Sequence, residues 1–298
     1  MIVPVFTHRD CLRHDPGPGH PETPERLHAV LARLAADPRA ELCQAEAGSR
    51  DDLRLVHPEQ HLLHLEAISR SGGGVISLDT VANDATWDAV LGATGAISAA
   101  LRQAHEGKSH AFAAVRPPGH HAMAHRAMGF CLVNNVVVAA RQAQRLGRER
   151  VLIIDWDVHH GNGTQALVEG DPTVRYVSLH QHPWYPGTGM AEERGVGNIF
   201  NVPRGPGAPA GLYVEDLWAA ITAALAHWPP EMVLLSAGYD AMAGDPLGGF
   251  TLEADDFARL TLRIREQLPA VPVVGMLEGG YAPARIAEGV AATVAALG

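Results

Sequence analysis

Side chains that could bind a metal ion follow a short apolar run near the middle of the sequence. Asp155, Asp157 and His159 are spaced two residues apart, directly after the run 151–154. If the extended conformation continues through them, these side chains point the same way. Carboxylate oxygens and imidazole nitrogens suit a borderline divalent ion such as zinc. Asp240 follows another apolar run and can supply a third ligand, which leaves a position open for water and substrate.

A hydrogen bond between Asp157 and His159 without a metal is the alternative interpretation. It would leave two carboxylates close together at a strand end of low dielectric with no cation, so we favour the metal site. Iron(II) or cobalt(II) would fit similar ligands, so these residues alone do not select zinc. The three cysteines, Cys11, Cys43 and Cys131, are too scattered for a structural cysteine site.

Two adjacent histidines, His120 and His121, follow the rigid turn 117–119. Two imidazoles beside a water at the metal could act as general base and general acid. Each needs an orienting partner on its far nitrogen, and Asp155 and Asn162 are the candidates. An aspartate partner would raise the basicity of its histidine, whereas an asparagine would leave the other closer to neutral. Considered alone, the pair is better explained as packing in a loop.

A tyrosine, Tyr281, follows Gly279 and Gly280, which allow close backbone approach. Its phenol could donate to an oxyanion that develops beside the metal. Considered alone, Tyr281 is a weak signal, because an ordinary tyrosine in a surface loop would have the same neighbours.

These residues require a scaffold that gathers the ends of several strands. Short apolar, β-branched runs alternate with longer Ala- and Leu-rich runs of helical period, which predicts an α/β fold with a mostly parallel sheet and helices on both faces. Ligands bind at the carboxyl ends of strands in such sheets, where the polar residues above lie. The predicted strands are 111–115, 151–154, 174–179, 232–236 and 271–277, and the predicted helices are 24–36, 85–104, 134–145, 213–226, 254–267 and 284–296.

Composition limits the class of protein and its partners. The 298 residues are 47% hydrophobic and 19% charged, which indicates a folded chain. A formal net charge of −10 argues against nucleic acid as a partner. Three scattered cysteines indicate a reducing compartment, and we see no signal core and no apolar stretch of membrane-spanning length. We therefore expect one catalytic domain over residues 1–298, in the cytoplasm and without a membrane partner.

Six segments together carry a family resemblance. They are RPPGHHA (116–122), GFCLVNN (129–135), DWDVHHGNGTQ (155–165), SAGYD (236–240), GDPLGG (244–249) and LEGGY (277–281). They resemble, in family order, the signatures of the zinc-dependent histone deacetylase family. That family includes bacterial deacetylase-like amidohydrolases, acetylpolyamine amidohydrolases and acetoin utilization proteins. Many members of the family have aspartate at the position of Asn162, and an asparagine there resembles the class II branch.

The resemblance implies a single-domain, arginase-like α/β fold around an eight-stranded, mostly parallel sheet. It implies one zinc ion per chain, bound by Asp157, His159 and Asp240. It implies that His120 and His121 are the acid/base pair.

The same resemblance assigns the remaining roles in catalysis. It places Asp155 behind His120 and Asn162 behind His121, and it implies that Tyr281 polarises the scissile carbonyl together with zinc. A structural potassium ion is also implied, and its predicted contacts are Asp155, Asp157, His159, Ser178 and Leu179.

Substrate contacts are implied for four residues. The Gly129 carbonyl would lie near the substrate amide nitrogen, while Phe130 and Tyr185 would line the tunnel for an acyl-lysine stem. Tyr185 stands where phenylalanine is usual, and the loop 123–126 is also atypical, so acyl-chain preference stays open. An acidic residue at position 247 would attract a polyamine cation, but the residue here is Leu247, which carries no charge.

The predicted activity is hydrolysis of an N-acyl amide, with acetyl or another acyl group removed from a lysine side chain of a protein or peptide. A deacylase of acetylpolyamines or other small N-acyl amines is the alternative, and a non-catalytic protein that binds an acylated ligand is another. A binuclear manganese ureohydrolase needs bridging carboxylates that Gly161, two places after His159, does not supply.

Overall fold

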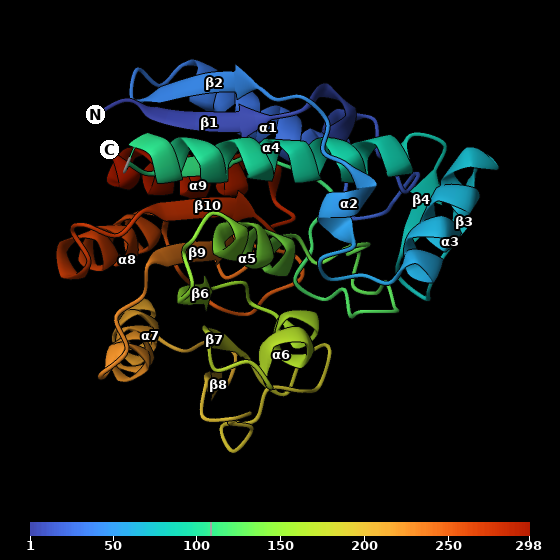
Figure 1. Cartoon of the computed structure of the whole chain (residues 1–298). Helices are drawn as coiled ribbons and strands as arrows, with labels where there is room; N and C mark the ends of the chain where they lie inside the picture. Colours follow the sequence, from blue (N-terminus) through green and yellow to red (C-terminus); the bar gives the residue numbers. More distant parts are fainter. Residues whose placement is uncertain (108) are drawn as a thin grey trace.

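A parallel sheet of eight strands forms the centre of the molecule. The computed structural model describes residues 1–107 and 109–298, and Figure 1 shows the whole chain. Within that part of the chain, every pairing in this sheet is parallel, so the predicted fold class is confirmed. In spatial order the strands are β2 (Ala40–Gln44), β1 (Val3–Thr7), β5 (Ala111–Ala113), β10 (Val273–Leu277), β9 (Met232–Ala237), β6 (Val151–Asp155), β7 (Val174–Gln181) and β8 (Ile199–Arg204).

Helices cover both faces of the sheet, as the alternating sequence pattern predicts. The longest, α4 (Thr86–Gly107), contacts β1, β5, β10 and α5 (Asn135–Arg145) and lies across the near face of the sheet in Figure 1. A second layer joins α1 (Pro24–Ala35), α8 (Ala254–Gln267) and α9 (Pro283–Leu297), while α7 (Ala210–Leu225) packs on β7 and β8. Shorter elements complete the chain: a 3₁₀ turn (Arg9–Leu12), α2 (Arg50–Leu53), α3 (Glu59–Arg70), α6 (Asn162–Val168) and the antiparallel pair β3 (Gly73–Val75) and β4 (Val81–Asn83).

The central strands are apolar because both of their faces are covered. Every residue of β5, β6, β9 and β10 is buried, whereas the edge strand β2 is only partly buried and carries polar residues. Strands covered on both faces are near-continuous hydrophobic runs, and this made them visible in the sequence. None of the described helices is both long enough and apolar enough to cross a bilayer.

The strands predicted from the sequence are the central ones, and the strands nearer the edges of the sheet were not predicted. Hydrophobic pattern indicated five of the eight strands and did not indicate β1, β2 or β8. The last strand begins at Val273 because Pro272 precedes it, and β5 ends at Ala113, two residues earlier than predicted. Helix α8 has the predicted bounds, and Gly147 follows the end of α5 with φ of +86°, as expected of a helix-terminating glycine.

The carboxyl ends of four central strands lie level with one another. Asp155 is in register with Ser178 on β7 and with Ser236 on β9. On the other side, Leu277 of β10 pairs with Ala237 of β9. Met276 of β10 also pairs with Ala113 at the end of β5. The segments after β5, β6, β9 and β10 therefore emerge at one edge of the sheet, and these segments contain the polar motifs found in the sequence.

Candidate metal and catalytic site

Three side chains at this edge form a compact group of metal-ligand type. Asp157, His159 and Asp240 each offer one ligand atom, and these atoms all lie within 4.8 Å of one another. His159 Nδ1 is 3.1 Å from Asp157 Oδ1 and 3.2 Å from Asp240 Oδ2. All three residues are buried. The structure thus brings together the three residues that the sequence predicts as metal ligands.

The charges in this group favour a divalent cation. Burial and the nearby carboxylate of Asp157 raise the pKa of Asp240 to about 7. Burial opposes protonation of His159, yet hydrogen bonds to both carboxylates raise its pKa to about 9. Both shifts arise because two carboxylates share a buried site, and a bound cation would balance them. Two carboxylates and an imidazole form a donor set that fits zinc.

Two glycines allow the loops to close around these carboxylates. A Cβ atom on Gly238 would lie 2.1 Å from Asp157 Oδ2, and one on Gly279 would lie 2.1 Å from Asp240 Oδ2. Main-chain N–H groups then orient the ligands, because Gly279 N donates to Asp157 Oδ2 at 2.8 Å and Val158 N donates to Asp240 Oδ1 at 2.7 Å. Such partners fix the direction of each ligand atom before a metal binds.

The strand does not continue through the ligands, so one sequence expectation is wrong. Strand β6 ends at Asp155, and a bend rather than a strand carries Asp157 and His159. The extended conformation on which the predicted alignment depended is therefore absent, although Asp157 and His159 still meet in the ligand group. Asp155 Oδ2 instead accepts hydrogen bonds from the Tyr176 hydroxyl, at 2.9 Å, and lies 3.1 Å from His120 Nδ1.

The two adjacent histidines have the two partners that the sequence predicts. His120 Nδ1 faces Asp155, while His121 Nδ1 lies 2.8 Å from Asn162 Oδ1, and the two ring centroids are 4.0 Å apart. Burial lowers the pKa of His120, but the carboxylates of Asp157 and Asp155 raise it to about 10. Burial and the neighbouring imidazoles hold the pKa of His121 well below its usual range. The two histidines thus have the two predicted partners, and their surroundings shift the two pKa values in opposite directions.

A cavity of about 260 Å³ opens beside this group. The predicted substrate contacts all line it, together with one histidine of the pair and one metal ligand. Two further lining residues, Asp79 and Trp184, were missed because neither belongs to a recognised motif. The full lining is Asp79, His121, Gly129, Phe130, His159, Trp184, Tyr185, Leu247 and Tyr281.

One wall of the cavity has an unusual backbone that neighbouring side chains hold in place. Gly129 and Phe130 have φ of +58° and +66°, in the left-handed region. Gly129 N donates to Asp79 Oδ1 at 3.0 Å, and Phe130 N donates to Thr80 Oγ1 at 3.1 Å. A Cβ on Gly129 would lie 2.4 Å from His121 Cδ2, so only glycine fits against the histidine.

The tyrosine loop is fixed by a buried arginine. The Arg26 guanidinium donates to the carbonyl oxygens of Gly280 and Glu278, and its carbon lies 4.8 Å from the centroid of the Tyr281 ring. Tyr281 N donates to Asp245 Oδ2 at 2.6 Å. Burial raises the pKa of Tyr281 well above its usual value, so the phenol keeps its proton at neutral pH. Sequence reasoning missed Arg26, which has no motif of its own.

The predicted potassium contacts are close together at the ends of β6 and β7. Asp155 pairs in register with Ser178. The Tyr213 hydroxyl donates to the carbonyl oxygens of Trp156 and Leu179, at 3.0 and 3.4 Å, so these two carbonyls converge. The potassium ion itself stays a prediction.

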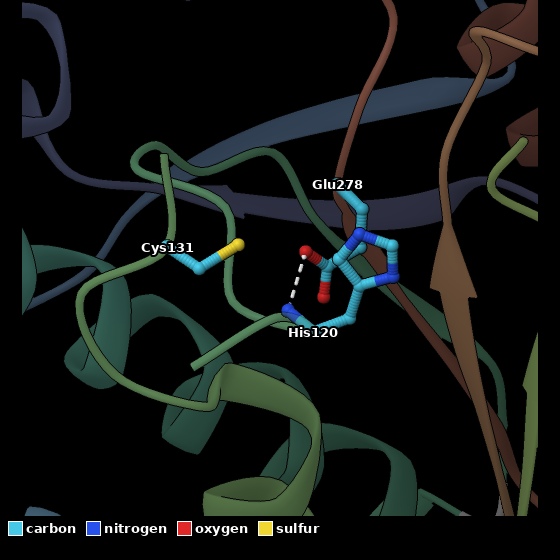
Figure 2. A group of neighbouring side chains, drawn as sticks. All are labelled: His120, Cys131 and Glu278. Carbon is cyan, nitrogen blue, oxygen red and sulfur yellow. Dashed lines mark hydrogen bonds between the residues drawn. The ribbon is translucent and has the colours of Figure 1, made fainter. Parts of the chain in front are cut away.

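A second group of ligand-type atoms consists of His120, Cys131 and Glu278 (Figure 2). Burial raises the pKa of the Cys131 thiol well above its usual value, and Sγ donates to Gly129 O at 3.3 Å. Both Glu278 oxygens already accept hydrogen bonds. A protonated thiol and a carboxylate with occupied oxygens do not form a metal site.

Comparison with known proteins places this arrangement in a family. Residues 20–297 match the model of the histone deacetylase domain. A probable deacetylase of Archaeoglobus fulgidus is 35% identical over 94% of this chain and 82% of the relative. A histone deacetylase-like amidohydrolase of Pseudomonas aeruginosa is 36% identical over 90% of this chain and 74% of the relative. The crystal structure of the HDA15 HD domain superimposes with a TM-score of 0.94 at 35% identity, covering 99% of this chain and 90% of that one.

Proposed function

The chain belongs to the histone deacetylase family, and from this premise we propose that it is a zinc-dependent deacylase of lysine side chains. The observation that carries the proposal is the cavity, because a metal ligand, a proton-transfer histidine and the phenol of Tyr281 all face it. We propose further that residues 1–298 form one catalytic domain and that it works in the cytoplasm. Three free cysteines, Cys11, Cys43 and Cys131, support the reducing location.

Asp157, His159 and Asp240 would hold the zinc ion. When bound, zinc would polarise the scissile carbonyl and lower the pKa of a water to about 7. The chain supports this position from behind, since Gly279 N, Val158 N and His159 N each donate to a ligand carboxylate. We also propose a structural potassium ion near Asp155.

The two histidines divide the proton transfers between them. His121 lines the cavity, and its depressed pKa leaves a neutral ring that can accept a proton from the attacking water. His120 holds its proton more tightly because Asp155 faces Nδ1. The pair then returns a proton to the leaving amine. Because the two rings lie 4.0 Å apart, the pair titrates as a coupled system.

Tyr281 would stabilise the negative charge on the carbonyl oxygen. Its phenol is protonated at neutral pH and reaches the cavity, so it can donate to an oxyanion there. Arg26 fixes the loop through two main-chain carbonyls, which keeps the donor in place before the substrate arrives.

The walls of the cavity fit the uncharged stem of an acyl-lysine. The rings of Phe130 and Tyr185 line it, and the Gly129 carbonyl would accept from the substrate amide. Leu247 adds no negative charge to this lining, whose one carboxylate, Asp79, already accepts a hydrogen bond from Gly129 N. An acetylpolyamine or another small N-acyl amine is the second candidate substrate, since the same chemistry would hydrolyse it.

Parallel assays on three substrate classes test the proposal. The substrates are acetyl-lysine peptides, longer acyl-lysine peptides and acetylated polyamines, each measured before and after chelation and again after zinc is returned. We expect turnover of a lysine peptide that chelation abolishes and zinc restores. Turnover of acetylated polyamines alone would show that they, and not acyl-lysine peptides, are the substrate class. Tight binding of acyl-lysine without turnover would identify a non-catalytic binder.

A further inference from the structure

A buried glutamate beneath the histidine pair has no role in the reaction described so far. Glu278 follows β10 and is fully buried. Its Oε2 accepts hydrogen bonds from the main-chain N–H groups of Gly119, at 2.6 Å, and His120, at 3.1 Å. Its Oε1 accepts from the Ser236 hydroxyl at 3.0 Å. Figure 2 shows the carboxylate beside the main chain of His120, with a dashed line to the His120 nitrogen.

The segment that carries the histidines has no strand or helix to hold it. It lies between the end of β5 and the start of α5, outside regular structure. Side chains and loop amides provide its hydrogen bonds instead. Thr164 N donates to the His120 carbonyl at 3.0 Å, and the Asn134 amide donates to the Ala122 carbonyl at 3.0 Å. Glu278 accepts from the N–H groups of the same segment, so it holds the main chain that carries the imidazoles, whereas Asp155 and Asn162 orient the rings.

We propose that Glu278 is a positioning residue, whose carboxylate anchors the main chain at Gly119 and His120 and thereby sets the position of both imidazoles. This inference rests on the proposed function. What matters is the reach of the side chain and its two acceptor oxygens. Burial raises the pKa of Glu278 to about 7, and both its charged and its neutral form can accept the two N–H bonds. The inference therefore predicts that charge is dispensable and length is not.

Two conservative substitutions separate length from charge. Glu278→Gln keeps the reach and one oxygen for the two amides, and its NH₂ group can donate to the Ser236 hydroxyl. Glu278→Asp keeps the charge but stops one methylene short. We expect E278Q to keep kcat within about threefold of the wild type. We expect E278D to lose about 100-fold in kcat, with KM within about twofold, because the histidines shift while the binding walls do not.

The reverse order would overturn the inference. If E278D is active and E278Q is not, the charge of Glu278 matters and its anchoring role does not. A rise in KM with kcat unchanged would also contradict the anchoring role. If E278D does not fold, E278Q still decides, since a large fall in kcat for this isosteric variant is incompatible with an acceptor role.

A matched variant controls for general loss of stability. The Asn198 amide is also buried and donates to the carbonyls of Val168, Asp171 and Val174, at 2.7, 3.0 and 2.8 Å. Val174 is the first residue of β7, so this cluster lies at the amino ends of the strands, away from the catalytic edge. Asn198→Ala should lower the melting temperature and leave kcat unchanged. A fall in kcat as large as that of E278D would show that destabilisation alone explains the effect.

Amide hydrogen exchange tests the anchor without any turnover. The Gly119 and His120 amides should exchange slowly in the wild type and in E278Q, and faster in E278D. Fast exchange in the wild type, or unchanged protection in E278D, overturns the inference even if the enzyme proves inactive. A wild type that hydrolyses no acylated substrate but shows this exchange pattern overturns the proposed function and supports the anchor.

Discussion

The floor of the cavity is built from side chains that follow sheet strands, whereas its rim is built from side chains on longer loops. Here the floor means the buried group His120, His121, Asp157, His159 and Asp240, of which His121 and His159 line the cavity, and the rim means Phe130, Trp184, Tyr185 and Leu247. Every floor residue is buried, while Trp184 and Tyr185 are 46% and 38% exposed.

The two regions are also held together by different forces. Floor side chains are joined by charged hydrogen bonds in a buried site, so removing one partner leaves another charge without compensation. The rim residues are held by contacts between rings and by isolated hydrogen bonds. In one of these, Trp184 Nε1 donates to the Leu247 carbonyl at 2.8 Å. Because the two regions share few of these contacts, a change in the rim need not disturb the floor. We therefore expect substitutions in the floor to change kcat and those in the rim to change preference.

The largest expected effect follows from removal of a metal ligand. Asp240→Ala should abolish zinc binding and lower kcat by at least about 1,000-fold, because the site loses one of its two carboxylates. Metal content per chain and turnover measure the result. Asp216→Ala, which removes a partly exposed carboxylate paired with Arg204, is the control and should keep both. Full zinc occupancy in D240A would contradict the ligand assignment.

The next effect tests the oxyanion donor. Tyr281→Phe removes only the hydroxyl, so the ring contact with Phe130, at 5.6 Å between centroids, is kept. We expect kcat to fall by about 100- to 1,000-fold, or roughly 3–4 kcal/mol, with KM and melting temperature little changed. A kcat equal to that of the wild type would remove Tyr281 from the mechanism.

The free energy of unfolding should depend on pH through His57, which supports the loop just before α5. His57 Nε2 accepts from Asn134 N at 2.8 Å, while Nδ1 lies 3.1 Å from the Ala124 carbonyl, so the ring must be neutral. Burial lowers the pKa of His57 from 6.5 to about 4. Because the folded pKa is below the unfolded one, stability is complete above pH 6.5 and falls as the pH drops toward 4.

Unfolding in denaturant at several pH values measures this effect. The contribution of His57 to the loss in free energy of unfolding should be roughly 3 kcal/mol for a shift of this size. The variant His57→Gln should lose less stability than the wild type over the same pH interval. An equal loss in both proteins would assign the pH dependence to other groups.

The smallest expected effect lies at the rim. Leu247→Glu adds a negative charge at the entrance, so the ratio of kcat/KM for acetylated polyamine over acetyl-lysine peptide should rise about 10-fold. Leu247→Gln separates charge from the loss of apolar surface. An equal rise in L247Q would show that charge at this position does not select the substrate, and a large fall in kcat would contradict the separation of rim from floor.

The sequence predicted most of the floor residues because they lie close together in the chain. His120 and His121 are neighbours, and Asp155, Asp157 and His159 lie within five residues, so their motifs are visible in one short stretch. The covered central strands were visible for a similar reason, as continuous apolar runs. Edge and near-edge strands such as β2 and β8 were missed because part of each faces solvent and mixes polar with apolar residues.

The supports of the site could not be predicted, because their partners are distant in the chain. Arg26 bonds Gly280, 254 residues away, and Glu278 bonds Gly119, 159 residues away. Only the folded sheet brings such pairs together. Arg26 lies in none of the six motifs, and Glu278 lies in LEGGY (277–281), but nothing in that motif identifies its partners. The spacing of Asp155, Asp157 and His159 predicted their alignment only for extended chain, and the strand ends at Asp155, yet Asp157 and His159 still meet in the ligand group.

In the proposed mechanism, two carboxylates and one imidazole hold a single catalytic zinc ion at the sheet edge. Anomalous diffraction at the zinc edge, on crystals of zinc-loaded protein with measured metal content, tests it most directly. We predict one zinc ion per chain, bound by Asp157, His159 and Asp240. A zinc-replete crystal with no ion between these side chains, or two manganese ions per chain in the protein as purified, would contradict the account.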